Sequence, residues 1–303
     1  MSRTASPGTG LVYGVERVCT IWGVPRSSFY AGQRRKVSDT TKPAARRRGP
    51  KPKISDADLL AAIVADLQAS PFVGEGYRKA WARLRVQQGI RVSRTRVRVL
   101  MRDNNLLSPH RARRRDGRSH DGTIITDAPN VMWGTDGVRV FTLEDGWGWI
   151  FPAVDHWNAE CVGWHVCKKG DRFAALEPIK MGLARLYGTT SAGAARGLSL
   201  RMDHGTQYLS DHFTNQIKFW GIHPSYSFVA EPQGNGVVER FNRTLKEQVV
   251  HGRIYRNIDE LRNAVRLFVD RYNAKWLVEK NDFLSPDQAR KQWNAAKSIR
   301  PAA

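Results

Sequence analysis

The strands and helices that the sequence predicts between residues 131 and 250 constrain the fold more than any other feature. Three successive strand-like runs come first, at residues 131–141, 148–154 and 160–167. The segment Glu144–Trp147, between the first two runs, is typical of a hairpin turn. Three helices then alternate with two short strands, at residues 172–186, 198–202, 210–220, 222–228 and 237–250. This order predicts an α/β fold with a mixed five-stranded sheet.

Two small helical units precede the sheet in the sequence. In residues 11–32, apolar side chains recur at helical spacing up to Trp22, Gly23 breaks the helix, and Pro25 stands where a second helix begins. This outline fits a helix-turn-helix, and it also fits any small helical hairpin. Residues 54–107 predict three helices, the third with Arg94, Arg98 and Arg102 on one face. Because like charges at this spacing repel, we expect an anionic partner, and favour DNA.

The positive charge of the chain is concentrated in its first 120 residues. The formal net charge is +21, and residues 1–120 carry 26 Lys and Arg against eight Asp and Glu. Part of this excess lies in two basic linkers, 33–53 with Arg46-Arg47-Arg48, and 108–120. We expect such runs to be extended until they meet a phosphate backbone, with a merely solvated charge run as the alternative. A membrane surface is the rival partner, but no apolar run approaches the roughly 18 residues of a spanning helix.

Three acidic residues occupy positions that strands or helices would present. Asp136 falls within the first strand, Asp203 ends the strand at 198–202, and Glu239 is one turn into a helix after the glycine-rich segment 232–236. An acid inside a strand is costly unless it is paired or metal-bound, and carboxylate oxygens suit Mg²⁺ and Mn²⁺. Carboxylates shared by two ions fit in-line displacement at phosphorus. Three unrelated acids that cap or turn the chain are the alternative.

The residues around these acids resemble the DDE transposases of bacterial insertion sequences, most closely the orfB type related to retroviral integrases. Asp203 and Glu239 are separated by 35 residues, as in that family, and Lys246 lies seven residues beyond the glutamate. The further matching segments are Trp133-Gly134-Thr135-Asp136, residues 203–208 and 231–247, Tyr272-Asn273, Leu284-Ser285-Pro286, and residues 77–106, which resemble the family's upstream helix-turn-helix. Lys275-Trp276-Leu277 stands where the family commonly has Arg-Pro-His, so the contacts of that loop are left open.

The resemblance implies an RNase-H-like catalytic core, preceded by small all-α helix-turn-helix modules. It further implies a polynucleotidyl transferase that cleaves DNA at transposon ends and transfers strands, without a covalent protein–DNA intermediate. By position, Asp136, Asp203 and Glu239 would be the catalytic triad and the ligands of two Mg²⁺ or Mn²⁺ ions. The residues expected to bind DNA are Arg243, Lys246, Gln207, Asn235, Arg94, Arg98, Arg102, Arg46, Arg47 and Arg48. The domains would then be 1–32, 33–53, 54–107, 108–120, a catalytic core at 121–291, and a tail at 292–303.

The partners implied are double-stranded DNA, as terminal inverted repeats and target, and further copies of the chain in a synaptic oligomer. Members of the family often need an upstream reading frame that supplies a dimerising zipper, and no heptad zipper is visible here, so the resemblance also implies an upstream-frame partner protein. Three cysteines without a Cys-x-x-Cys pair favour reduced surroundings, and we expect a bacterial cytoplasmic, nucleoid-associated protein without a membrane partner. Two other functions stay open: a catalytically dead DNA-binding regulator, and a nuclease that does not join strands. Asp155-His156 could pass for a catalytic pair, but a strand-end turn is the simpler interpretation.

Overall fold

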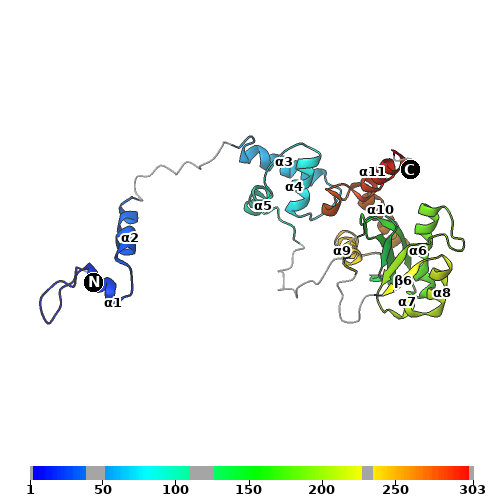
Figure 1. The fold of residues 1–303 in the computed structure, drawn as a ribbon, viewed down its shortest axis with the longest axis horizontal. Helices are drawn as coiled ribbons and strands as arrows, with labels where there is room; N and C mark the ends of the chain where they lie inside the picture. Colours follow the sequence, from blue (N-terminus) through cyan, green and yellow to red (C-terminus); the bar gives the residue numbers. More distant parts are fainter. Residues whose placement is uncertain (1–2, 39–51, 110–123, 125, 227–234, 300–303) are drawn as a thin grey trace. The chain divides into compact units, whose positions relative to one another are not determined.

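The computed structural model describes residues 3–38, 52–109, 124, 126–226 and 235–299, in two compact units, Met1–Lys53 and Ile54–Ala303 (Figure 1). The first unit is a pair of helices, α1 (Val15–Ile21) and α2 (Arg26–Ser38). Residues 33–53 were expected to be an extended linker, but helix α2 continues through the first six of them. The reason is that good helix formers follow Gly32 and none of residues 33–38 is a glycine or proline. Arg46, Arg47, Arg48 and most of both basic linkers lie outside the described residues.

The second unit begins with three helices, α3 (Asp56–Ala69), α4 (Tyr77–Val86) and α5 (Arg94–Asp103). Ser55 and Ser93 cap α3 and α5 by accepting hydrogen bonds from backbone amides of the first turn. The buried side chains of these helices form one core, which contains Leu59, Ile63, Ala80, Trp81, Ala82, Leu84, Val97 and Met101, together with Leu277 from far along the chain. The helical domain therefore needs a C-terminal residue to complete its core.

The sheet has strands β1 (Met132–Thr135), β2 (Val138–Thr142), β3 (Gly146–Asp155), β4 (Cys161–Cys167), β5 (Ser199–Met202) and β6 (His223–Tyr226). Both β1 and β2 pair antiparallel with β3, and their register is continuous, since Thr135 opposes Ala153 and Val138 opposes Ile150. They are thus one strand interrupted at Asp136-Gly137. β4 pairs antiparallel with β3, whereas β5 and β6 extend the sheet in parallel from β1. The expected mixed five-stranded sheet is confirmed.

Helices cover both faces of this sheet. One face packs against α6 (Arg172–Tyr187) and α8 (Asp211–Phe219), the other against α9 (Gly236–Leu245) and α10 (Ile258–Lys275), and Figure 1 shows α8 and α9 on opposite sides. Successive residues of β3 alternate between the two cores, Phe151 and Ala153 toward α6, Ile150 and Val154 toward α10. Helix α6 approaches so closely that a Cβ on Gly163 would lie 2.0 Å from the Pro178 carbonyl oxygen.

Shorter elements complete the second unit: α7 (Thr206–Leu209), the π-helical turn η2 (Lys246–Val250), the 3₁₀ turn η3 (Glu279–Asn281) and α11 (Pro286–Ile299). Helix α11 crosses residue 292, where we expected a tail to begin, and it is anchored because Arg290 pairs with Asp155 at 2.8 Å and with Glu160. In the described part of the chain, no helix combines the length and apolar character that crossing a membrane requires.

Candidate active site

Strand alternation brings Asp136 and Asp203 to the face of the sheet that α9 covers. Trp133 in β1 and Met202 in β5 belong to the core under α6, so side chains an odd number of residues away point to the opposite face. Helix α9 lies there, since Cγ2 of Val238 is 2.4 Å from where a Cβ on Gly134 would stand. The first turn of α9 carries Glu239. All three acids that the sequence singled out therefore come from elements that meet on this face.

Asp136 lies in the break between β1 and β2 rather than inside a strand. Its Oδ1 accepts a hydrogen bond from the Gly137 amide at 2.7 Å, and its Oδ2 accepts one from Nδ2 of Asn242 at 2.8 Å. Burial raises the pKa of Asp136, and the charge of Asp203 raises it further. The two hydrogen bonds and the charge of Lys246 oppose this rise without cancelling it.

The charge of Asp136 is linked to both other acids, since Asp203 acts on Asp136 and Asp136 acts on Glu239. Burial raises the pKa of Glu239, as does the charge of Asp136, while Arg243 lowers it. Asp203 is exposed, and its Oδ1 accepts a hydrogen bond from the Gly205 amide at 2.9 Å. Within the described ranges, none of the three acids forms an ion pair with a Lys or Arg. Lys246 and Arg243 thus act on two of these acids through their charge, but none of the described ion pairs neutralises the three carboxylates.

The donor chemistry of this group suits a hard divalent cation, because all its side-chain donors are carboxylate oxygens. Among the residues whose placement is described, however, no three carboxylate, imidazole or thiol side chains are arranged to hold one metal ion together. The three acids are electrostatically coupled but do not close on a common point. Binding of two ions stays a prediction.

A buried polar layer behind the acids was missed by the sequence analysis. Asn242 is 4% exposed, and Asn235, which we assigned to DNA, is 7% exposed and donates from Nδ2 to the Thr135 carbonyl oxygen at 3.2 Å. His156 lies beside Asn235, and its pKa is lowered to about 4 by burial and by the charge of Lys280. A Cβ on Gly134 would lie 2.6 Å from Oδ1 of Asn235 and 2.8 Å from Nε2 of His156, so only glycine fits there. Helical spacing could have found Asn242, three residues after Glu239.

The basic residues expected to contact DNA fall into two groups. Arg243 and Lys246 are exposed on α9 and η2, and their charges act on Glu239 and Asp136. Arg94 is instead paired with Glu279 at 2.9 Å and stacked over Trp81, and Arg102 bonds the adjacent Asp103 at 2.8 Å. Both arginines therefore have a carboxylate partner within the chain, and their contact with DNA stays a prediction. Arg98 is exposed.

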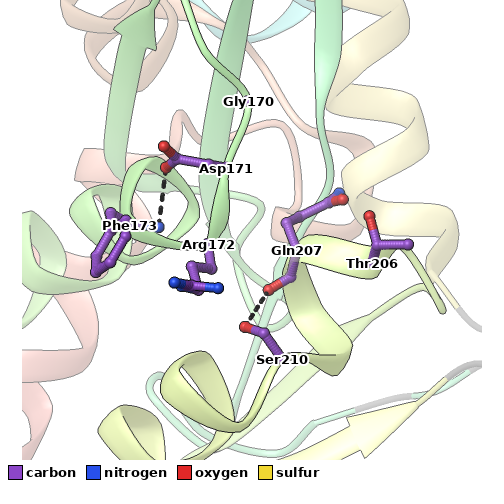
Figure 2. Close-up of a pocket in the computed structure, with 7 residues that line it drawn as sticks. All are labelled: Gly170, Asp171, Arg172, Phe173, Thr206, Gln207 and Ser210. Carbon is purple, nitrogen blue, oxygen red and sulfur yellow. Dashed lines mark hydrogen bonds between the residues drawn. The ribbon is translucent and has the colours of Figure 1, made fainter.

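Gln207 lines a cavity of about 530 Å³ (Figure 2). Thr206, another lining residue, lies three positions after Asp203 in the chain. The wall is formed by the start of α6 and by α7, with residues Gly170, Asp171, Arg172, Phe173, Thr206, Gln207 and Ser210. Asp171 caps α6 by accepting from the Phe173 and Ala174 amides, and the Ser210 hydroxyl donates to the Gln207 carbonyl oxygen at 3.0 Å. The fully buried Tyr208 turns inward against Thr135, and burial raises the pKa of its hydroxyl.

Lys275-Trp276-Leu277, the departure from the family pattern, joins the helical domain to the sheet domain. Leu277 is buried in the core of α3–α5, and the Trp276 ring packs edge-on against Phe72 with centroids 4.9 Å apart. The ammonium of Lys79 lies 3.9 Å from the Trp276 ring centroid and donates to the Leu277 carbonyl oxygen. This loop therefore serves packing between domains.

Known proteins resemble the chain over these same regions. The integrase core domain family matches residues 126–232 and 220–286, and an HTH-like domain family matches residues 58–115. The transposase for insertion sequence element IS629 of Shigella sonnei is 24% identical over 294 residues, which cover 94% of each chain. The chain belongs to the bacterial insertion-sequence transposases of the integrase superfamily. The transposase InsD for insertion element IS2 of Escherichia coli is 26% identical over 202 residues, 64% of this chain and 65% of that one.

Two retroviral structures are also similar to the chain. One is the simian T-cell lymphotropic virus intasome in complex with a PP2A regulatory subunit, 17% identical with a TM-score of 0.43, covering 65% of this chain and 69% of that one. The other is the catalytic core domain of BIV integrase, 20% identical with a TM-score of 0.39, covering 56% of this chain and 99% of that one. The resemblance drawn from the sequence is confirmed by the family matches.

Proposed function

We propose that this chain is a DNA transposase that cleaves DNA at transposon ends and transfers the cut strands, with Asp136, Asp203 and Glu239 as its catalytic carboxylates. One observation carries the proposal: the charge of Asp203 acts on Asp136 and that of Asp136 acts on Glu239, and in the described part of the chain none of the three forms an ion pair with a Lys or Arg. Structural acids of the same domain are paired, as Asp155 is with Arg290 at 2.8 Å. Unpaired acids that repel one another mark a site for a cation.

The three carboxylates would bind Mg²⁺ or Mn²⁺, and two ions are the number that the resemblance implies. When bound, the cation supplies charge stabilisation for in-line displacement at phosphorus. Asp136 would be a ligand through its carboxylate, oriented by the Gly137 amide and the Asn242 side chain. Glu239 would approach from α9, which Val238 and Leu245 fix to the sheet by complete burial.

DNA is the partner that fits the basic side chains beside the acids. Arg243 and Lys246 stand exposed next to Glu239 and Asp136, where each supplies a charge for a phosphate of the transposon end. The helical domain at 54–107 would position terminal repeats, as its match to an HTH-like family supports. Assembly of several copies into a synaptic complex and an upstream-frame partner remain parts of this proposal.

A strand-transfer assay tests the proposal, with labelled terminal-repeat duplexes, a target duplex and Mg²⁺. The chain should yield joined product, whereas nicks alone would indicate a nuclease and binding without product a regulator. Asp136→Asn, Asp203→Asn and Glu239→Gln should each abolish cleavage and joining while retaining end binding, since lost ligation removes several kcal/mol of stabilisation. Asp211→Asn, an exposed acid in the first turn of α8, is the matched control and should stay active. A variant that keeps activity within about tenfold, roughly 1.4 kcal/mol of barrier, would remove its residue from the triad.

A further inference from the structure

The hairpin of β2 and β3 presents aromatic and arginine side chains to solvent. Phe141 and Trp147 oppose each other in the register, are 52% and 53% exposed, and meet edge-to-face with ring centroids 5.5 Å apart. Arg139 and Trp149 form the next pair on the same face of the hairpin. The guanidinium carbon of Arg139 lies 4.7 Å from the Trp147 ring centroid and 5.4 Å from that of Trp149. Arginine and aromatic rings thus alternate along one face of the hairpin.

The same pattern continues from the hairpin to the cavity beside Asp203. Gly170 adjoins Trp149 so closely that a Cβ there would lie 2.5 Å from the indole ring. Gly170 is also a wall residue of the cavity, together with Arg172 and Phe173 (Figure 2). The guanidinium carbon of Arg172 is 4.9 Å from the Phe173 ring centroid. We call this surface the aromatic–arginine strip: Arg139, Phe141, Trp147, Trp149, Arg172 and Phe173.

The charge of the strip is positive because the acids near it already form ion pairs or cap a helix. At the hairpin turn, Glu144 pairs with Arg256 at 2.7 Å and Asp145 pairs with Lys168 at 3.8 Å. Asp171 caps α6. Within the described residues, Arg139 and Arg172 have no carboxylate partner, and their cationic groups lie only over rings. The surface therefore complements a polyanion that also offers flat apolar faces.

We propose that the aromatic–arginine strip binds single-stranded DNA by stacking unpaired bases on Trp147 and Phe141. Bases stack on exposed aromatic side chains irrespective of sequence, and arginine adds attraction for the backbone. Paired bases are stacked within the duplex and do not offer their faces, so the strip selects unpaired nucleotides. The inference rests on the proposed function, because cutting strands near Asp203 creates strand ends that leave the duplex, and the strip adjoins the cavity beside Asp203.

Fluorescence anisotropy with labelled oligothymidine of about 16 nucleotides tests the proposal, in full-length Asp136→Asn protein without metal. Trp147→Ala and Phe141→Ala should each weaken binding about fivefold or more and leave the slope of log affinity against log salt unchanged. Arg139→Gln should reduce that slope by about 0.7. The matched control is Phe219→Ala, which removes an aromatic ring that is equally exposed, 53%, but lies outside the strip. Binding of a duplex of equal length should be unaffected by all four changes.

A photo-reactive thymidine probe should also crosslink to peptides within residues 139–149, which separates direct contact from an indirect effect of the substitutions. Equal losses on single strands and duplex, or no loss on either, would overturn the proposal. So would a fall in assembly size by light scattering in Trp147→Ala with single-strand binding intact, because the strip would then be an interface between copies of the chain. No metal or cleavage step enters this assay, so a failed strand-transfer experiment would refute the proposed function separately.

Discussion

Replacing Asn242 with leucine would test how the site keeps Asp136 ionised. The side-chain amide of Asn242 donates to Oδ2 of Asp136 at 2.8 Å, and leucine preserves much of the buried volume while it removes the donor. The Oδ1 atom of Asn242 has no hydrogen-bond partner in the described structure, so the fold loses nothing through that atom. The main consequence of Asn242→Leu therefore concerns the Asp136 carboxylate.

The expected size follows from the contacts of Asp136. A hydrogen bond to a charged group contributes about 1.5–3 kcal/mol, and about 1.4 kcal/mol changes a protonation equilibrium tenfold. Burial and Asp203 already raise the pKa of Asp136, while Asn242 is one of the groups that oppose the rise. Its removal raises this pKa further, so protons compete better with a cation. The acid limb of the pH–activity profile should move upward by about one to two pH units.

The measurement is the rate of strand transfer by Asn242→Leu between about pH 5 and 9 at fixed Mg²⁺, compared with the unaltered chain. Activity lost at low pH should return at high pH, and thermal unfolding should change little. Asn215→Leu, at an exposed position of α8, is the control and should leave the profile in place. An activity loss of equal size at every pH would mean that Asn242 supports only packing, and the electrostatic argument would fail.

Three further predictions concern Lys246, His156 and Leu277. Lys246→Ala should weaken binding to transposon ends by about 1–3 kcal/mol if Lys246 reads a base edge. The activity of pre-assembled complexes should change much less. Equal losses of affinity for transposon ends and for random duplex in a competition assay would make Lys246 a backbone contact. The pKa of His156 is lowered to about 4 in the folded chain, against about 6.5 in the unfolded chain. Neutral His156 therefore contributes about 3 kcal/mol to the free energy of unfolding above pH 6.5, and this contribution is lost as the pH falls toward 4. Melting temperature should therefore depend less on pH in this window for His156→Leu, and identical curves would contradict the assignment. Leu277→Ala should cost about 2–5 kcal/mol of unfolding free energy by denaturant titration, whereas Leu267→Ala, 43% exposed, should cost much less.

Local pattern accounted for the elements of the second unit and for the identity of its acids. Strand-like runs predicted the three antiparallel strands, and helical spacing predicted the helix at 237–250, in which Val238, Leu245 and Val249 are buried at 0%, 0% and 2% exposure. These features depend on neighbours within a few residues, where periodicity and steric preference act directly. For the same reason, the sequence could point to Asp136, Asp203 and Glu239 before any fold was known.

Contacts between distant segments were decided only by the tertiary structure. No periodicity reports that Arg94 meets Glu279, that Leu277 completes the core of the helical domain, or that Asn242 donates to Asp136. Such pairs form when packing of whole elements brings side chains together. Arg94 and Glu279 lie 185 residues apart along the chain, Asn242 and Asp136 lie 106 apart, and Leu277 lies 176 to 218 residues from the buried residues of the helical domain. Thus the sequence determined the strands, the helices and the acids, while tertiary packing determined which charges stay exposed for DNA and which are neutralised within the chain.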